Sequence, residues 1–490
     1  MPKRTTPYAL TLPTPDGVRG AHWLTTSLRH EILAGRLRAG ARLPSTRELA
    51  QQYGVARGTV VNAFDQLKSE GYLDGSQGSG TYVSAVLPDA LLHVDNATVG
   101  PRAASRTTHR LSAFGRRMRA FDTFDPLRPV RAFRPNLPAL DHFPSAPWAR
   151  LAARRVRTLR SSLLLGCEPL GYAPLRAAIA EYVGAARGVR CDPQQILIVS
   201  GTQEALDLSV RLLLDPGDRA LIEDPGYDGA RSAFVAAGAR IRAVPVDAEG
   251  MLVPPARARD ARLLFVTPGH QYPLGVTMSL RRRLALLDWA RDSGTLIFED
   301  DYDSEFRYSG RPVPALQGLD RADLVLFAGT FSKVLFPALR LGYLVVPARL
   351  VDTFAAAKSL VHRHAPLLEQ AILCDFITEG HFGRHLRRMR EIYAQRLDVL
   401  LEHAHARLAG MLNVSPIEAG LQTVATLREG IDADALAHAA AQRQVEIVPI
   451  DLAASGAPAV RGVQLGFAAV DLPEIRRGVR ELSRLVNAIK

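Results

Sequence analysis

Apolar, strand-like runs alternate with helical stretches through the middle of the chain, and this alternation constrains the fold more than any other feature. The runs lie at 196–199, 220–223, 263–266, 295–298, 325–328 and 341–346. Strands that alternate with helices form a largely parallel sheet covered by helices. Open sheets of this kind bind their ligands at the carboxyl ends of the strands. The sequence therefore predicts an α/β domain whose site residues follow the strands.

A single lysine, Lys333, follows the predicted strand 325–328 and stands among hydroxyls. Thr330 and Ser332 flank it, and Arg340 lies seven residues beyond it. A lysine amine can form a Schiff base with an aldehyde, while hydroxyls and a guanidinium can hold a phosphate dianion. Pyridoxal phosphate (PLP) needs this combination, although a lysine after a strand is more often a solvated surface residue.

An acidic run ends the predicted strand 295–298, and Asp300 stands 33 residues before Lys333. A carboxylate under the pyridine nitrogen of PLP keeps that nitrogen protonated, so that the ring can act as an electron sink. The spacing suits two neighbouring strands joined by one crossover. An acidic turn that only caps a strand is the alternative, but the combination with Lys333 favours a PLP site.

The turn after the strand 196–199 supplies a further part of the predicted site. Gly201, Thr202 and Gln203 lie between this strand and a helix start. Free backbone N–H groups and the positive end of a helix make such a turn a phosphate cradle. Without Lys333 downstream, an ordinary strand-to-helix turn would be the simpler reading.

The first 84 residues carry a different pattern. Apolar residues recur every four positions from 24 to 32 and predict a helix. Ser45, followed three residues later by Glu48, is a capping box that starts a second helix. A third helix is predicted at 57–70 and a β-hairpin with a glycine-rich turn at 72–83. Two helices around a tight turn, followed by a wing, indicate either DNA binding or a small helical domain that docks on the rest.

Length, net charge and cysteine content limit the number of domains, the partners and the compartment that we expect. A chain of 490 residues is long enough for about three domains. Its net charge of +12 permits a nucleic-acid partner without proving one. Three scattered cysteines have no metal-type spacing and indicate a reducing compartment, so no metal site is predicted. No run approaches the ~20 apolar residues of a membrane helix, and we expect a cytoplasmic protein.

The predicted domains are 1–84, a winged helix-turn-helix; 85–130, a basic linker; 131–346, a large parallel-sheet domain; and 347–490, a small α/β domain. The linker is expected to be a semi-flexible tether because no periodicity persists there.

The segments 44–50, 70–73 and 78–83 closely resemble the winged helix-turn-helix of GntR-type regulators, and 300–343 resembles the MocR subfamily. In that subfamily this DNA-binding domain is fused to a fold-type I, PLP-dependent aminotransferase-like domain. The resemblance covers nearly the whole chain except the linker. It implies DNA contacts by Arg42, Ser45, Arg47, Arg57 and Thr59, with Gly80 of the wing approaching the minor groove. The family usually carries Ser where Ala56 stands, so the recognition helix lacks a hydroxyl cap.

The same resemblance implies further roles at the cofactor. Tyr227 matches the aromatic residue that stacks on the pyridine ring. Tyr272 stands where true aminotransferases place Asn, and Tyr302 could supply the hydrogen bond to the cofactor 3-hydroxyl instead. A small-domain arginine clamps the substrate carboxylate in this fold, and Arg461 is the residue predicted for that role.

Two functions remain open on the sequence. One is a transcriptional regulator that holds PLP on Lys333, senses PLP or an amino compound, and binds double-stranded DNA as a head-to-tail homodimer. The other is a working aminotransferase with an accessory DNA-binding module, in which Lys333 is also the proton-transfer base. The fused helix-turn-helix favours the regulator. A purely structural dimerisation domain is disfavoured by Lys333, Asp300 and Arg340 together.

Overall fold

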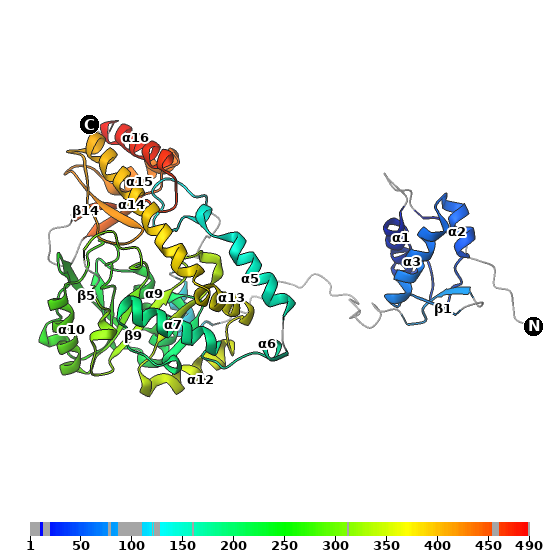
Figure 1. Ribbon diagram of the computed structural model, residues 1–490, viewed down its shortest axis with the longest axis horizontal. Coiled ribbons are helices and arrows are strands. Elements are labelled where there is room, and N and C mark those ends of the chain that lie inside the picture. The colour runs from blue at the N-terminus through cyan, green and yellow to red at the C-terminus, as the bar shows by residue number, and fades with distance from the viewer. Residues whose placement is uncertain are drawn as a thin grey trace, which may run out of the picture. The chain divides into compact units, whose positions relative to one another are not determined.

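The computed structural model describes residues 10–12, 20–76, 80–86, 110–119, 121, 128–158, 161–310, 313–452 and 460–488. The chain divides into two compact units, residues 1–109 and 110–490, which we call the winged unit and the C-terminal unit. Figure 1 colours the first unit blue and the second from cyan to red. Among the described residues, none of the helices is long and apolar enough to cross a membrane.

The winged unit has the predicted three helices and hairpin. Its elements are α1 (Ala21–Leu33), α2 (Thr46–Tyr53), α3 (Arg57–Ser69), β1 (Leu73–Ser76) and β2 (Gly80–Val83). The two strands pair antiparallel. Leu24 and Leu28 of α1 are buried in one cluster with Val60, Phe64 and Leu67 of α3. The apolar residues that recur every four positions therefore form the buried face of α1, and the helix predicted from them is present.

The ends of α2 and α3 follow from local chemistry. Ser45 Oγ accepts from the N–H of Glu48 at 3.3 Å, and the Glu48 carboxylate accepts from the N–H of Ser45 at 2.7 Å. This is the predicted capping box. Gly54 ends α2 with a φ of +65°, a conformation that glycine adopts without strain. Ala56 precedes α3 and provides no side-chain cap.

An eight-stranded sheet forms the centre of the C-terminal unit, in the order β3-β10-β9-β8-β7-β4-β5-β6. Its strands are β3 (Ile196–Val199), β4 (Arg219–Asp224), β5 (Arg240–Asp247), β6 (Gly250–Met251), β7 (Ala261–Val266), β8 (Leu296–Asp301), β9 (Val325–Thr330) and β10 (Gly342–Val345). The five strands from β9 to β5 run parallel. β10 runs antiparallel between β3 and β9. The largely parallel α/β sheet predicted from the alternation is confirmed, and each predicted strand is present.

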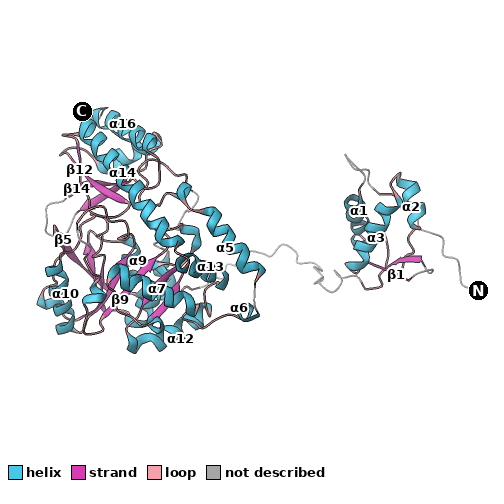
Figure 2. Cartoon of the chain, viewed as in Figure 1, coloured by secondary structure: helices cyan, strands magenta, loops and turns pink. Residues whose placement is uncertain are grey.

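Helices cover both faces of this sheet (Figure 2). They are α7 (Ala173–Arg187), α8 (Thr202–Leu213), α9 (Asp228–Ala237), α10 (Leu280–Ser293), α11 (Leu316–Leu319), α12 (Val351–His362) and α13 (Leu367–Thr378). Successive residues of a strand point to opposite faces, and the core follows this rule. Leu197 and Val199 pack in the cluster that includes α8, α9 and α12, while Ile196 and Ile198 pack in the cluster that includes α7 and α13.

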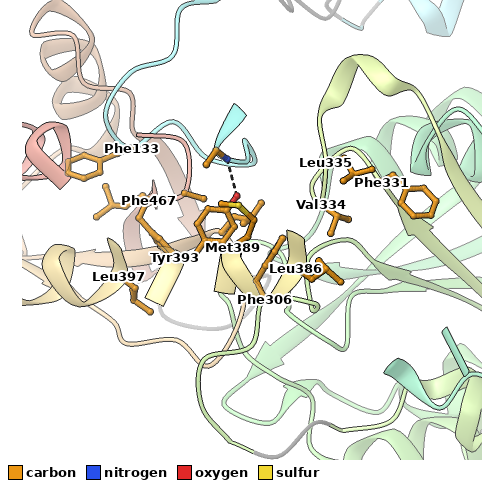
Figure 3. Packing of buried hydrophobic residues seen from close by; sticks show 14 of the residues in the cluster. Phe133, Phe306, Phe331, Val334, Leu335, Leu386, Met389, Tyr393, Leu397 and Phe467 are labelled. Atoms are coloured by element: carbon orange, nitrogen blue, oxygen red, sulfur yellow. Dashed lines mark hydrogen bonds between the residues drawn. The ribbon is translucent and has the colours of Figure 1, made fainter. Parts of the chain in front are cut away.

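A smaller antiparallel sheet, β11-β12-β14-β13, forms the second part of the C-terminal unit. Its strands are β11 (Leu412–Val414), β12 (Gln422–Leu427), β13 (Val448–Leu452) and β14 (Val460–Gly466), and its helices are α14 (His381–Leu408), α15 (Ala433–Gln442) and α16 (Leu472–Ala488). Figure 3 shows Met389 and Tyr393 of α14 between Phe467 on one side and Val334 on the other. One hydrophobic core thus joins the small sheet to the segment that carries Lys333.

The predicted domain bounds stay a prediction, but the packing crosses them. Phe133 lies next to Gly466 of the small sheet, although it belongs to the predicted large domain. Phe354 of α12 lies in the core of the large sheet, although it follows the predicted boundary at 346. The remaining helices of this unit are α4 (Ala113–Met118), α5 (Ser145–Arg157) and α6 (Ser161–Leu165).

Most of the predicted linker lies outside the described residues. Its described part differs from the expected tether, because α4 is helical and Ser112 caps it. Arg117 of α4 donates to the carbonyl oxygen of Ala236 in α9 at 2.8 and 3.0 Å. This stretch of the linker is therefore attached to the C-terminal unit.

Candidate functional site

The turn from β3 into α8 forms an open cradle. Gly201 has a φ of +138°, which only glycine adopts readily, and α8 begins at the next residue. A Cβ built on Gly201 would lie 3.8 and 3.9 Å from the two terminal nitrogens of Arg340. The guanidinium therefore stands over the amino end of α8, where backbone N–H groups favour an anion.

The hydroxyls near Lys333 lie at the carboxyl end of β9. Thr330 is buried, and its Oγ1 accepts from the backbone N–H of Ser332 at 3.2 Å. Gln203 is exposed and donates from Nε2 to the carbonyl oxygen of Gly229 at 3.2 Å. Its side chain is thus turned toward the start of α9 rather than toward Arg340.

Asp300 links the cradle to the centre of the sheet. It lies near the end of β8, paired with Ala328 of β9, and it is 5% exposed. Its Oδ1 accepts from Thr202 Oγ1 at 3.2 Å. Burial raises the pKa of Asp300 to about 7, although the bond from Thr202 opposes the shift. A buried carboxyl without a full counter-charge is suited to pair with a cation that a ligand brings.

Lys333 is partly buried, and its Nζ donates to the carbonyl oxygen of Asn136 at 2.7 Å. Desolvation lowers the pKa of Lys333 to about 8, against the opposing charges of Asp303 and Asp300. A lowered pKa increases the fraction of neutral amine, the form that attacks an aldehyde. Asn136 has a φ of +61°, a left-handed conformation that asparagine tolerates better than most residues.

Three tyrosines lie near these groups. The Tyr227 ring is 5.7 Å from that of Tyr272 and 6.1 Å from that of Phe265. Burial raises the pKa of Tyr227 to about 12, and so keeps this phenol neutral. The Tyr302 hydroxyl lies 3.1 Å from His270 Nδ1.

Two buried acidic residues escaped the sequence reasoning. Asp303 pairs with His270 at 2.8 Å between Oδ1 and Nδ1, and both side chains are 1% exposed. Its Oδ2 accepts from the N–H of Leu421, which ties β8 to the small sheet. Glu223 is fully buried and accepts from Thr267 Oγ1 at 2.6 Å. Asp303 follows β8 and Glu223 lies near the end of β4, at strand ends that were predicted to carry the site, and that position was the signal available.

The structure does not bring Arg461 to this group. It is exposed and lies near the start of β14, paired with Asp451. Val463 and Leu465, two and four residues on, point into the hydrophobic core, so Gln464 faces the other side of the sheet. Gln464 is fully buried, and Tyr272 reaches its Oε1 from the hydroxyl at 3.5 Å. The geometry therefore does not support Arg461 as the ligand's carboxylate clamp, and it puts a neutral amide near the tyrosines instead.

The residues expected to contact DNA gather at the amino ends of α2 and α3 and on the wing. Arg42, Ser45, Arg47 and Arg57 are exposed, and Thr59 is partly buried. Arg57 Nε donates to Thr46 Oγ1 at 3.4 Å, which links the two helix starts.

The wing joins the same surface. A Cβ built on Gly80 would lie 2.9 Å from Arg42 Nε, so the Arg42 side chain crosses the glycine of the wing. Gly80 has a φ of +97°. Arg42 and Gly80 thus lie side by side on the wing, and Arg57 joins the start of α3 to the start of α2.

The residues of the C-terminal site fit PLP. The open cradle at Gly201 with Arg340 over it suits a phosphate, the amine of Lys333 suits an aldehyde, and buried Asp300 suits a pyridinium nitrogen. All of them lie at strand ends of one sheet, as the sequence predicted.

Comparison with known families gives two matches. The family described as aminotransferase class I and II matches residues 136–482, and bacterial regulatory proteins of the gntR family match residues 24–83. The chain is 42% identical over 467 residues to the probable rhizopine catabolism regulatory protein MocR of Rhizobium meliloti, covering 95% of this chain and 94% of that protein.

Two enzymes are also similar. A 2-aminoadipate transaminase of Thermus thermophilus is 31% identical over 360 residues, covering 72% of this chain and 89% of the enzyme. The crystal structure of LysN, an α-aminoadipate aminotransferase from the same organism complexed with N-(5'-phosphopyridoxyl)-L-leucine, matches with a TM-score of 0.66 at 30% identity. That match covers 74% of this chain and 92% of the LysN chain. The aminotransferase fold implies pyridoxal phosphate as the cofactor, and the gntR match makes the chain a DNA-binding regulator. The chain belongs to the MocR-type regulators of the GntR family, in which a winged helix-turn-helix is joined to a fold-type I aminotransferase domain.

Proposed function

We propose that this regulator holds pyridoxal phosphate on Lys333 and changes its DNA binding when an amino compound, or the cofactor itself, occupies the site. The observation that carries the proposal is the gathering of Lys333, Asp300 and the Gly201 cradle at one sheet edge, in a chain that also has a DNA-binding unit. When bound, pyridoxal phosphate supplies an aldehyde that condenses with primary amines, which lets such a site recognise an amine.

Each site residue has a specific part in this proposal. The N–H groups around Thr202, the hydroxyls of Thr330 and Ser332, and the guanidinium of Arg340 hold the phosphate. Asp300 pairs with the pyridinium nitrogen, which lowers the cost of its own buried charge. Tyr227 packs against the ring, and Tyr302 orients the 3-hydroxyl side together with His270. Gln203 has its side chain elsewhere, so its backbone N–H is the part that serves the phosphate.

The DNA-binding part rests on the face formed by Arg42, Ser45, Arg47, Arg57, Thr59 and Gly80. The amino end of α3 enters the major groove, with Arg57 and Thr59 near the base edges. Arg42, which crosses the wing glycine, contacts backbone phosphates. A ligand alters DNA affinity only if it binds one state of the protein more tightly than the other.

We also propose a cytoplasmic, head-to-tail homodimer. Support comes from apolar side chains that the C-terminal unit leaves exposed at the ends of α6 and α12: Leu164, Leu165, Leu360 and Val361, of which Leu165 and Leu360 are 88% and 85% exposed. The two helix ends are adjacent, because a Cβ built on Gly166 would lie 2.6 Å from His364 Nε2. A contiguous apolar patch of this kind marks an association surface. If Leu165→Asp and Leu360→Asp together leave the molar mass in light scattering unchanged, the patch is not the dimer contact.

Two measurements test the sensing function. The purified, PLP-loaded protein should absorb at roughly 400–430 nm, where lysine-bound pyridoxal phosphate absorbs, and Lys333→Ala should lose this band. Footprinting of its own promoter region should then change when PLP or amines are added to the wild type, and should not change in Lys333→Ala. A wild type that stays colourless, or whose footprint ignores both additions, contradicts the proposal.

A working aminotransferase is the second candidate function. The observation that favours it is that the charge of Asp300 acts on Lys333, whose pKa desolvation lowers to about 8, since such a lysine can also move a proton. Sustained multiple-turnover transamination without sequence-specific DNA binding would favour the enzyme over the regulator.

A further inference from the structure

We propose that the effector site selects a primary amine that carries hydroxyl or other neutral oxygen groups, and selects against an amine that carries a carboxylate. This inference rests on the sensing function proposed above, and it names the chemical class of the ligand. Two buried glutamines of the small sheet, Gln422 and Gln464, carry it.

The two glutamines lie on the same face of the sheet. Val424 is paired with Gln464, and Gln422 is paired with Gly466, so the glutamines are diagonal neighbours on β12 and β14. Diagonal neighbours of an antiparallel pair stand about 7–8 Å apart. The same face packs through Val424 against Leu274, a residue of the loop that carries Tyr272.

Both amides are connected to the groups around Lys333. Gln422 Oε1 accepts from the backbone N–H of Asn136 at 2.8 Å, and the carbonyl oxygen of Asn136 accepts from Lys333 Nζ at 2.7 Å. Gln464 Oε1 is reached by the Tyr272 hydroxyl at 3.5 Å. The two side chains thus stand where the polar part of a bound amine would extend from Lys333.

The amide nitrogens are the informative atoms. Gln464 is fully buried and Gln422 is 1% exposed, yet Nε2 of each has no hydrogen-bond partner among the described residues. A buried, unpaired N–H group is unfavourable, and such groups in native proteins usually serve a ligand or a water. Together the two amides offer four N–H donors, which suit the oxygen atoms of hydroxyl, ether or carbonyl groups.

The local charge argues against a carboxylate. Arg461, the arginine expected for that role, is exposed and lies on the other face of β14. Asp300 and Asp303 already place buried acidic groups near Lys333. A carboxylate taken out of water needs a close cation, and neutral amides do not supply one.

Arg134 carries a positive charge that acts on Lys333, so it could pair with a ligand carboxylate and weaken this argument. One terminal nitrogen of its guanidinium is already bonded, however, since Nη1 donates to the carbonyl oxygens of Arg128 and Pro129. Arg134 is therefore the residue to remove in the decisive control.

The test compares ligand pairs that differ in one group. Serinol and serine, and 4-amino-1-butanol and 4-aminobutyrate, differ only by a CH₂OH in place of a carboxylate. Each is titrated into the full-length, PLP-loaded protein, with the visible band and the operator affinity as readouts. We expect the amino alcohol of at least one pair to bind about tenfold tighter than its amino acid, the factor that about one net hydrogen bond provides.

Variants of the glutamines sharpen the result. Gln464→Arg should reverse the preference, because a guanidinium at this position would face the site and pair with a carboxylate. Gln464→Leu and Gln422→Leu should each weaken the amino alcohols without a gain for the amino acids. Arg461→Gln is the matched control on the opposite strand face and should change neither ligand.

The inference is overturned if the wild type binds the amino acids as tightly as the amino alcohols. If Arg134→Gln then abolishes that binding, Arg134 is the residue that binds the carboxylate. Failure of both members of both pairs to bind also counts against it. A wild type without the visible band is a different result, because it removes the PLP-sensing function itself before any ligand is compared.

Discussion

Replacing Glu223 with glutamine should change how stability depends on pH. Glu223 is fully buried near the carboxyl end of β4, and desolvation raises its pKa from 4.5 to about 8 against the bonds from Thr267. A carboxyl whose pKa is higher in the folded protein stabilises the fold at low pH. That stabilisation is lost as the pH rises toward the folded value.

The size of the effect follows from the two pKa values. Between pH 6 and pH 8 the unfolded chain holds Glu223 ionised while the folded protein keeps much of it protonated. One unit of pKa difference corresponds to about 1.4 kcal/mol. The free energy of unfolding should therefore fall by about 2 kcal/mol over this interval because of Glu223 alone. Glu223→Gln cannot titrate and can still accept the bonds from Thr267.

The assay is urea unfolding of wild type and Glu223→Gln at several pH values, followed by tryptophan fluorescence. Two of the three tryptophans, Trp148 and Trp289, lie in the C-terminal unit, so the signal reports mainly on the unit that contains Glu223. The stability of the variant minus that of the wild type should grow by about 2 kcal/mol from pH 6 to pH 8. The exposed control Glu391→Gln should show no such growth. A difference for Glu223→Gln that is constant or shrinks over this interval would refute the reasoning.

Three further outcomes are expected. Gly80→Ala should weaken operator binding in mobility-shift titrations, because its Cβ would meet Arg42 Nε at 2.9 Å; losses that simply add to those of Arg42→Ala would contradict a shared surface. Phe354→Ala should cost roughly 3–5 kcal/mol in urea unfolding, since this ring is fully buried beneath the large sheet, whereas Leu360→Ala, at an 85% exposed position, should cost little. The rate at which Lys333 captures added pyridoxal phosphate in stopped-flow absorbance should rise with pH to about 8 and then level off, because desolvation lowers the pKa of this amine to about 8; a rate that climbs steadily to pH 10 would show an ordinary lysine.

The winged unit was predictable because its signals are local. The capping box of Ser45 and Glu48 needs only a three-residue spacing, and Gly54 ends α2 by its own backbone freedom. The buried face of α1 is visible as a four-residue period. None of these features depends on distant parts of the chain, so the sequence carries them almost completely.

The large sheet was predictable in its strands but less so in its order. Strands such as β3 and β9 are almost continuous apolar runs, as expected where both faces are covered. β5 was missed because it carries Arg240 and Arg242 and is only partly buried, so it lacks that composition. The antiparallel insertion of β10 between β3 and β9 depends on pairing with Ile196–Val199, more than 140 positions away, and no local pattern reports it.

The same difference between local and long-range signals explains how much of the candidate site the sequence predicted. Lys333 and Asp300 could be proposed from the sequence because Lys333 follows β9, Asp300 lies near the end of β8, and each has a chemistry that PLP needs. The contact between Lys333 and Asn136 spans 197 positions, and the His270–Asp303 pair lies between two loops. These neighbours are set by sheet order and by the way the segment around Phe133 folds back against Gly466 of β14. The chemistry of a residue identifies whether it can take part in the site, whereas the fold determines which other residues lie beside it.

Arg461 and Gln464 show that the sequence contained a signal, the alternation of residues along a strand, that the choice of Arg461 ignored. The choice of Arg461 rested on charge alone, since an arginine suits a carboxylate. In a strand, however, residues an odd number of positions apart face opposite sides. Val463, Leu465 and Phe467 are apolar and pack in the core, so Gln464 must face the other way, and Arg461 shares the parity of the core residues. A polar amide that alternates with core residues is also more informative than an arginine near a strand end, because a buried amide is unfavourable unless something bonds to it, while an arginine at an exposed end is well solvated.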